Sequence, residues 1–247
     1  MTKPPLLLRA AARANQLKRQ CLDSYHKVFP KAKLQSAKAH WRDKRNECRI
    51  GQILFDTLSQ SEREDMRRIL EFGCNWGGNL GFFLEKLNQA TCLGIDINPV
   101  AHELEAVFPS RYEGRTGDEN ALTSLQDRSF DLAFTSSVLD HIPSRPVVVD
   151  VIKHLTRISS VVFLLEPWVE GIEGDVSGKQ RAQVRKDLPN PYKVFADHSY
   201  LWNYDEILND LGLTWQKTPQ PLHAASLGPF YHLYRIEGRS GKGARLP

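Results

Sequence analysis

From residue 68 onward, the chain alternates short apolar runs with segments of helical periodicity, and no other feature constrains its fold as strongly. Strands that alternate with helices form βαβ units, whose strands lie parallel in one sheet. We therefore predict an α/β fold on a mostly parallel sheet. The expected strands lie at 69–72, 91–95, 112–115, 130–135 and 161–165, with helices at 80–87, 100–108 and 146–158.

The C-terminal part of the sequence predicts one more helix and an antiparallel strand pair. Asn203, with Glu206 three residues later, resembles a capping box, and Gly212 ends the helix expected at 204–211. Strands expected at 213–217 and 230–236 flank a loop that contains Pro, His and Gly. Residues 238–247 are predicted to form a flexible basic tail.

Composition excludes several protein classes. The 247 residues are 41% hydrophobic and 25% charged, which suits one full hydrophobic core. The longest apolar runs end well before the roughly 20 residues that cross a bilayer. The four cysteines (Cys21, Cys48, Cys74 and Cys92) lack the spacing of a zinc site or a disulfide framework. We therefore expect a cytoplasmic protein with no metal and no membrane partner.

Charge is concentrated at the N-terminus. Residues 1–50 contain 13 Lys/Arg and 3 Asp/Glu, a net charge of +10, whereas the rest of the chain carries −6. This asymmetry fits a nucleic-acid partner, although basic Leu/Ala-rich segments are more often solvated helix faces. Residues 1–22 contain no acid and weakly resemble an organelle transit peptide. We interpret residues 1–64 as a basic helical extension that precedes the main domain.

The most informative segment is 69–80, where an apolar strand ends in an acid and enters a Gly-rich turn before a helix. Such a turn brings backbone N–H groups close to a ligand at the carboxyl edge of a sheet. The spacing of Gly73 and Gly77 does not match the dinucleotide pattern. Glu71 would repel a pyrophosphate but suits a cationic ligand. Asn75, between the glycines, belongs to a residue type that tolerates left-handed backbone.

Further acids follow the next strands. Asp96 stands 25 positions after Glu71, where an acid can accept hydrogen bonds from both ribose hydroxyls. Asp118 follows the third strand and can accept a hydrogen bond from the exocyclic amine of adenine. Residues 130–143 would line the other side of the pocket. Together these acids favour a positively charged nucleoside as the ligand.

The motifs Glu71-x-Gly73-x-Asn75-x-Gly77, Asp96 and Gly117-Asp118, with the stretch 130–143 and the closing strand pair, resemble a class I S-adenosylmethionine-dependent methyltransferase over residues 65–237. The resemblance implies a Rossmann-like seven-stranded sheet, mostly parallel with an antiparallel last strand, and S-adenosyl-L-methionine as cofactor. Asn75 departs from the family pattern, which usually has Gly there. The cofactor contacts it implies are Glu71, Gly73, Asn75, Gly77, Asp96, Ile97, Asp118, Glu119 and Ser136.

Two residues are candidates for catalysis. His141 lies just beyond the fourth strand, and histidine is the side chain that ionises near neutral pH, so it can act as a general base. The alternative interpretation is that His141 is a structural histidine that forms a hydrogen bond with a neighbouring turn. Glu166 ends the fifth strand, where it can anchor an amine or hydroxyl of the substrate or form a salt bridge with a basic N-terminal helix.

Substrate-binding candidates lie mainly in the long insertion 168–201. Its glycines and its aromatic end are typical of a mobile lid, and a plain surface excursion is the alternative. His198, Tyr200 and Trp202 would then contact the substrate. Trp76, in the Gly-rich turn, either stacks on the substrate or covers the start of the following helix.

The leading hypothesis is a methyltransferase that acts on an O or N atom of a small molecule. The fourth strand lacks the Asn/Asp-Pro-Pro-aromatic run of exocyclic-amine nucleic-acid methylases, and no Pro-Cys pair offers a cytosine-attacking thiolate. The alternative is an RNA or protein methyltransferase that holds its substrate with residues 1–50. A third possibility is a cofactor-binding protein that has lost turnover.

Overall fold

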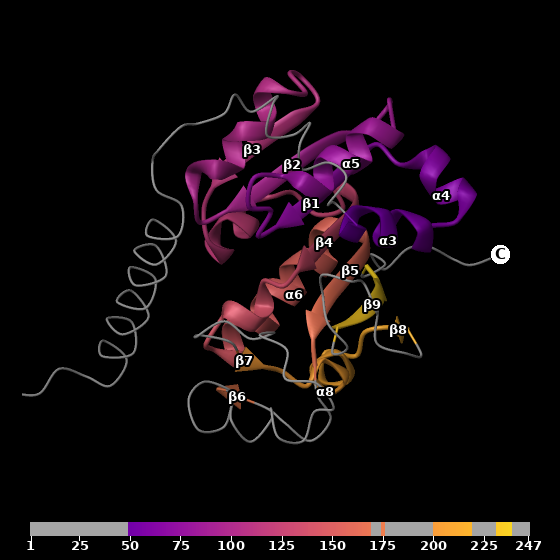
Figure 1. Cartoon of the computed structure of the whole chain (residues 1–247). Coiled ribbons are helices and arrows are strands. Elements are labelled where there is room, and N and C mark those ends of the chain that lie inside the picture. The colour runs from indigo at the N-terminus through magenta and orange to yellow at the C-terminus, as the bar shows by residue number, and fades with distance from the viewer. Residues whose placement is uncertain (1–48, 169–173, 176–199, 219–230, 239–247) are drawn as a thin grey trace, which may run out of the picture.

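A seven-stranded sheet runs through the computed structural model in the order β3-β2-β1-β4-β5-β9-β8 (Figure 1). The structure describes residues 49–168, 174–175, 200–218 and 231–238. Six strands point the same way, and β9 alone is antiparallel to its neighbours, which confirms the predicted sheet. The strands are β3 (Tyr112–Thr116), β2 (Thr91–Asp96), β1 (Arg68–Phe72), β4 (Phe130–Ser136), β5 (Ser159–Pro167), β9 (Tyr231–Glu237) and β8 (Trp215–Lys217).

Both faces of the sheet are covered, so its central strands read as nearly continuous apolar runs. In β1, for example, Ile69 packs into one core cluster and Leu70 into the other. The first face is covered by α3 (Arg49–Thr57), α5 (Gly78–Lys86) and η2 (Pro99–Ala106). The second is covered by η3 (Glu119–Ser124), η4 (Leu139–His141), α6 (Arg145–Ile158) and α8 (Tyr204–Asp210).

The segment expected to be helical at 100–108 is a 3₁₀ helix, η2, rather than an α-helix. Within this helix the Ala101 carbonyl accepts a hydrogen bond from the Tyr112 hydroxyl at 2.8 Å. The predicted end of α8 is confirmed. Asn203 accepts a hydrogen bond from the Glu206 N–H, and Gly212 has a positive φ of 63°.

The N-terminal boundary of the core differs from the prediction. Leu54 and Leu58 on and just after α3 are buried in the same cluster as β1 and α5. The short helix α4 (Gln60–Asp65) is tied to β9 by an ion pair between Glu62 and Arg235 at 2.7 Å. The division predicted after residue 64 therefore separates residues that share one core. Residues 1–48, which hold 12 of the 33 Lys/Arg and nearly all of the N-terminal excess of positive charge, lie outside the described residues.

Of the insertion 168–201, the structure describes Trp168 and a two-stranded pair, β6 (Gly174–Asp175) with β7 (Tyr200–Leu201). His198 and the rest of the predicted lid lie outside the described residues, as does the tail 239–247. Across the part of the chain that is described, no helix is both long enough and apolar enough to cross a membrane.

Candidate active site

The turn after β1 is fastened to the end of β2. The N–H groups of Gly73 and Cys74 both donate to the Ile95 carbonyl, at 2.7 and 3.1 Å. The Asn75 N–H donates to Asp96 Oδ2 at 2.8 Å. Asn75 has a φ of 50°, which confirms that it adopts the left-handed backbone that its residue type tolerates. The two strand ends are therefore held together before any ligand binds.

Asp96 retains acceptor capacity at this edge. It is 9% exposed, and its Oδ1 accepts hydrogen bonds from the Asn98 N–H at 2.9 Å and from Asn98 Nδ2 at 3.1 Å. A carboxylate has about four acceptor positions, so Oδ2, which accepts from the Asn75 N–H, can accept another hydrogen bond. Asn98 Oδ1 is buried and has no hydrogen-bond partner within the described residues. These two oxygens suit a ribose with two hydroxyl donors.

Glu71 is a buried acid with one oxygen that has no hydrogen-bond partner among the described residues. It is 1% exposed, and its Oε1 accepts from Asn79 Nδ2 at 2.7 Å, whereas Oε2 finds no partner in the described part of the chain. Burial and the nearby charge of Asp96 raise the pKa of Glu71 well above its ordinary value. A cationic ligand end would offset both effects, so the site suits a positively charged molecule.

The remaining predicted cofactor residues come from neighbouring strand ends. Asp118 caps η3, and its Oδ1 accepts from the N–H and the Nδ2 of Asn120, both at 3.0 Å. Glu119 follows it as the first residue of η3 and is partly buried. The Ser136 hydroxyl, at the end of β4, is buried without a partner among the described residues. Ile97, directly after Asp96, is 44% exposed, more than any other large hydrophobic residue described.

Glu166 lies beneath the turn that follows β4. It is fully buried, and it accepts hydrogen bonds from the N–H groups of Val138, at 3.1 and 3.2 Å, and Leu139, at 3.2 Å. Burial, together with Asp140, raises the pKa of Glu166 to about 8, although its hydrogen bonds act in the opposite direction. Its described partners are therefore backbone groups, and no cation from the described residues contacts it.

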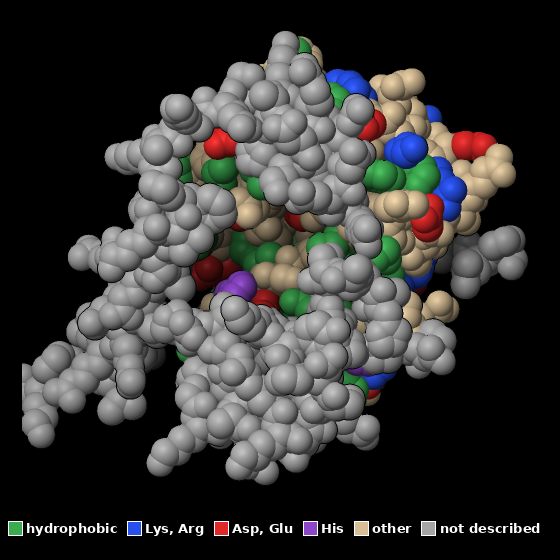
Figure 2. All heavy atoms as spheres, in the orientation of Figure 1, with side chains coloured by type: hydrophobic (Ala, Val, Ile, Leu, Met, Phe, Trp, Pro, Cys, Tyr) green, Lys and Arg blue, Asp and Glu red, His purple; other side chains and the backbone are tan. Residues whose placement is uncertain are grey.

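His141 stands at the surface of this edge, next to a buried acid. Its side chain is 49% exposed, and its Nε2 lies 3.8 Å from Asp140 Oδ1. Asp140 itself is 3% exposed, and its Oδ1 has no hydrogen-bond partner within the described residues. Figure 2 shows acidic and histidine side chains among hydrophobic ones in a hollow of the described surface. An accessible imidazole at the end of β4 can take a proton from a bound molecule.

Comparison with known families agrees with this geometry. A family model described as a methyltransferase domain matches residues 70–160, which include the Gly-rich turn, Asp96, Asp118 and His141. Residues 70–160 therefore match a methyltransferase domain, and the fold is that of class I S-adenosylmethionine-dependent methyltransferases. Such a domain is expected to bind S-adenosylmethionine, and the unpartnered oxygens of Glu71, Asn98 and Ser136 fit a cationic nucleoside with hydroxyl and amine donors.

Solved structures share the fold at low sequence identity. Magnesium protoporphyrin IX methyltransferase from Synechocystis PCC 6803, solved with bound SAH, has a TM-score of 0.57 and 14% identity, with 92% of this chain and 99% of that chain covered. An O-methyltransferase family protein from Burkholderia thailandensis has a TM-score of 0.55 and 15% identity, with 83% of this chain covered. The methyltransferase spans only 59% of that protein. The PH0226 protein from Pyrococcus horikoshii OT3 has a TM-score of 0.55 and 15% identity, with 87% and 99% covered. A search of curated proteins finds no match.

Two predicted substrate residues of the methyltransferase are used in packing. Trp202 is 6% exposed, and its Nε1 donates to the Leu139 carbonyl at 3.1 Å. Its ring stacks on Tyr200 with a centroid distance of 6.0 Å and an interplanar angle of 9°. The N–H and most of the surface of Trp202 are therefore engaged in packing, and its contact with substrate stays a prediction. Trp76 is partly buried and packs against the core cluster on the α5 side, as one of its two interpretations predicted.

The sequence analysis missed Asp140 as a site residue. The only signal in the sequence is its position directly before His141, and adjacency alone does not show that the acid is buried under the imidazole. Metal chemistry has no candidate either, because no group of three or more His, Cys, Asp or Glu side chains that could hold an ion occurs among the described residues.

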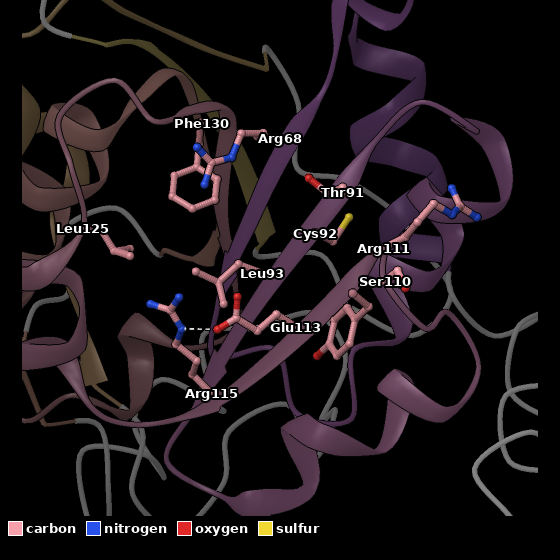
Figure 3. Close-up of a pocket in the computed structure, with 11 residues that line it drawn as sticks. Arg68, Thr91, Cys92, Leu93, Ser110, Arg111, Glu113, Arg115, Leu125 and Phe130 are labelled. Carbon is pink, nitrogen blue, oxygen red and sulfur yellow. Dashed lines mark hydrogen bonds and ion pairs between the residues drawn. The ribbon is translucent and has the colours of Figure 1, made fainter.

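A hollow of about 290 Å³ opens at the other end of the strands (Figure 3). Its lining comes from the beginnings of β1 to β4, including Arg68, Leu93 and Phe130. On its β3 side, Arg115 Nε pairs with Glu113 Oε1 at 2.6 Å. Ligands of parallel α/β sheets bind beyond the carboxyl ends of the strands, so this hollow is separate from the methyl-transfer site.

Proposed function

We propose that the methyltransferase transfers a methyl group to an O or N atom of a small-molecule acceptor. The charge of the carboxyl edge carries this proposal. The carboxyl groups of Glu71, Asp96, Asp140 and Glu166 lie at or just after the ends of β1, β2, β4 and β5. Burial keeps some of them protonated, as the raised pKa values of Glu71 and Glu166 indicate, but in either state they offer a polyanion no attraction, whereas they can accept hydrogen bonds from a neutral or cationic molecule.

Cations near this edge support the same proposal, because those described are already paired with acids. Arg145, at the start of α6, lies 3.3 Å from Glu206 and 3.4 Å from Asp210. Lys217, at the end of β8, lies 2.6 Å from Asp205. Phosphate recognition needs arginine or lysine groups that are available to the ligand.

The residues of the chain have a limited chemical task. S-adenosylmethionine supplies a methyl group that is already activated. The protein must align the acceptor, exclude water and take a proton if the acceptor arrives protonated. In the proposal His141 takes that proton, and Glu166 acts through the turn above it. Trp76, His198, Tyr200 and Trp202 remain predicted substrate contacts, and 168–201 remains a predicted lid.

Transfer of radiolabelled methyl from S-adenosylmethionine into a host-cell extract tests the proposal. The extract is afterwards separated into small-molecule, nucleic-acid and protein fractions. We expect label in the small-molecule fraction, and none with an Asp96→Ala variant that serves as the control. Label that precipitates with macromolecules and is released by ribonuclease or protease would contradict the proposal.

A second candidate is an RNA or protein methyltransferase, which the net charge of +10 over residues 1–50 favours. Binding through phosphate contacts weakens steeply with salt. Under this alternative, labelling of RNA would fall by more than tenfold between 50 and about 200 mM salt. Salt-insensitive turnover would count against it.

Substitution of the proposed base separates catalysis from cofactor binding. We expect His141→Gln to lower turnover about 100-fold, within the range of general-base effects, because no other exposed base is described beside it. Cofactor affinity, measured by calorimetry, should stay within about twofold of the parental value. His102→Gln is the matched control, since His102 is an exposed histidine paired with Glu105 on η2. Parental turnover in the His141 variant would rule out this assignment.

A further inference from the structure

The turn that carries His141 is fastened from several directions. Ser137 has a φ of 54°, its N–H donates to the Leu165 carbonyl at 3.1 Å, and its hydroxyl donates to the Tyr231 hydroxyl at 3.1 Å. Glu166 accepts from the next two N–H groups, and Trp202 donates to the Leu139 carbonyl. A surface turn does not require so many buried contacts, so this turn is held in one geometry.

Two buried carboxyl groups lie under this turn and influence one another. The charge of Asp140 contributes to the raised pKa of Glu166, and burial raises the pKa of Asp140 while His141 opposes that rise. Close carboxyl groups in a desolvated site hold a single negative charge between them. Thr135, Tyr204 and Tyr231 also face this pair and are uncharged near neutral pH, so His141 is the group that can carry a compensating positive charge.

The two acids differ in what their oxygens contact. Glu166 accepts hydrogen bonds from the backbone N–H groups of Val138 and Leu139, whereas Asp140 Oδ1 has no hydrogen bond within the described residues and faces the imidazole at 3.8 Å. That distance is typical of an ion pair and is longer than a hydrogen bond. Asp140 is therefore the acid with an unsatisfied oxygen beside His141.

We propose that Asp140 is a positioning residue for methyl transfer, whose carboxylate orients the His141 imidazole and stabilises it once it is protonated, while Glu166 holds the turn that carries both. This inference rests on the proposed function, in which His141 accepts the proton of the acceptor. It adds a second residue to the site, and it gives the buried acid a role that packing alone does not explain.

The O–H or N–H bond of the acceptor breaks, and its proton goes to the ring nitrogen of His141 that faces away from Asp140. The electron pair left on the acceptor atom forms the bond to the methyl carbon, and the pair of the broken S–C bond stays on sulfur. The imidazolium that results lies beside the Asp140 carboxylate, and it releases its proton to water after the product leaves.

The first test is a double-variant cycle with Asp140→Asn, which keeps the shape of the side chain and removes its charge. The measured quantity is the initial rate of label transfer from radiolabelled S-adenosylmethionine into the small-molecule fraction of the extract. We expect Asp140→Asn to be about 10-fold slower than the parent, within the range of general-base contributions. In a His141→Gln background, the same change should have no further effect. Equal losses in the two backgrounds, or a parental rate in Asp140→Asn, would overturn the inference.

The second test does not depend on the acceptor. In the full chain with ¹³C-labelled histidine, the His141 signal is assigned by its loss in His141→Gln, and the order parameter of its ring is measured. We expect a rigid ring in the parent and a value below about 0.6 in Asp140→Asn. The same order parameter in both proteins overturns the inference, whatever the extract shows. If the parent labels no fraction, the proposed function fails, and the order parameters still decide the role of Asp140.

A second variant separates a defect in folding from the loss of the carboxylate charge. Asp140→Glu keeps the charge, and we expect its rate to exceed that of Asp140→Asn by severalfold. Both variants should bind S-adenosylmethionine within about twofold of the parental affinity, since Asp140 lies at the end of β4, away from Asp96. If Asp140→Asn fails to fold, the comparison of Asp140→Glu with the parent carries the test, and a rate as low as that of His141→Gln would overturn the inference.

Discussion

The two halves of the carboxyl edge of the sheet are built in different ways. In the cofactor half, at the ends of β1 and β2, Asp96 and the backbone of the Gly-rich turn bind one another. In the acceptor half, at the ends of β4 and β5, Asp140 and Glu166 are buried under a turn, and one carboxylate oxygen has no partner within the described residues. Glu71 is a buried acid in the cofactor half as well, but there the backbone of the turn is bound directly to the neighbouring strand end, whereas the acceptor half has two buried acids beneath a single turn.

The largest effect should come from the acceptor half and depend on pH. The pKa of Glu166 is about 8 in the folded protein and near 4.5 when the chain is unfolded, so the folded state binds the extra proton between these values. The free energy of unfolding should thus be highest below pH 4.5 as far as Glu166 is concerned, and fall by up to about 5 kcal/mol as pH rises from there through 8. Glu166→Gln should flatten this slope.

Urea unfolding at pH 5 and pH 8 measures that slope in the parent and in Glu166→Gln. Part of the slope should remain, because burial raises the pKa of Glu71 in the same direction. Glu113→Gln is the matched control, since Glu113 is an exposed acid paired with Arg115. If the unfolding free energy changed with pH by the same amount in Glu166→Gln and in the parent, the stability of the protein would not depend on the proton bound by Glu166.

Gly73 lies where the two halves of the carboxyl edge pack against each other. A Cβ on Gly73 would lie 2.2 Å from Val138 Cγ2, and its φ is 78°. We expect Gly73→Ala to cost about 3 kcal/mol of unfolding free energy through left-handed strain and overpacking together. Gly212→Ala is the control, because Gly212 has a φ of 63° but nothing within 4 Å of its Cβ position, so only strain of about 1 kcal/mol is added. If Gly73→Ala and Gly212→Ala lowered the free energy of unfolding by the same amount in chemical denaturation, the two halves would not be tightly packed at Gly73.

The cofactor half is tested by Asp96→Ala. Loss of its charged hydrogen bonds to ribose should weaken S-adenosylmethionine binding about 100-fold in a calorimetric titration. Asp131→Ala is the matched control, since Asp131 also accepts from two backbone N–H groups, those of Arg67 and Arg68, but at the opposite edge of the sheet. Its affinity should stay within about twofold of the parental value. Unchanged affinity in the Asp96 variant would remove this acid from the cofactor site.

The smallest effect concerns the exposed Ile97. Apolar surface beside a ribose-binding acid is suited to cover an adenine ring, and loss of that contact is expected to cost about 1 kcal/mol, or about fivefold in affinity. Ile97→Ser should show this loss by calorimetry, and Ile97→Leu should not. If the serine variant binds as tightly as the parent, the adenine lies elsewhere.

Local patterns predicted the cofactor half well. The strand ends at Phe72 and Asp96 follow from apolar runs that stop at polar residues, and the left-handed Asn75 follows from its residue type. These features depend on neighbours within a few positions, which periodicity and turn chemistry describe. The acceptor half was predicted less well, because Trp202 and Glu166 meet the turn from segments that are 63 and 27 positions away from Leu139.

The sequence by itself determined the parallel sheet, the place of the turn after β1 and the order of acids along its carboxyl edge, because each of these is encoded by short-range spacing. Only the tertiary structure decided that α3 belongs to the core, that Trp202 packs under the turn, and that Asp140 lies buried beside His141. Burial is a property of everything that packs around a residue. Since burial raises the pKa of both Asp140 and Glu166, the chemistry of the acceptor half emerges only when distant strands and helices come together.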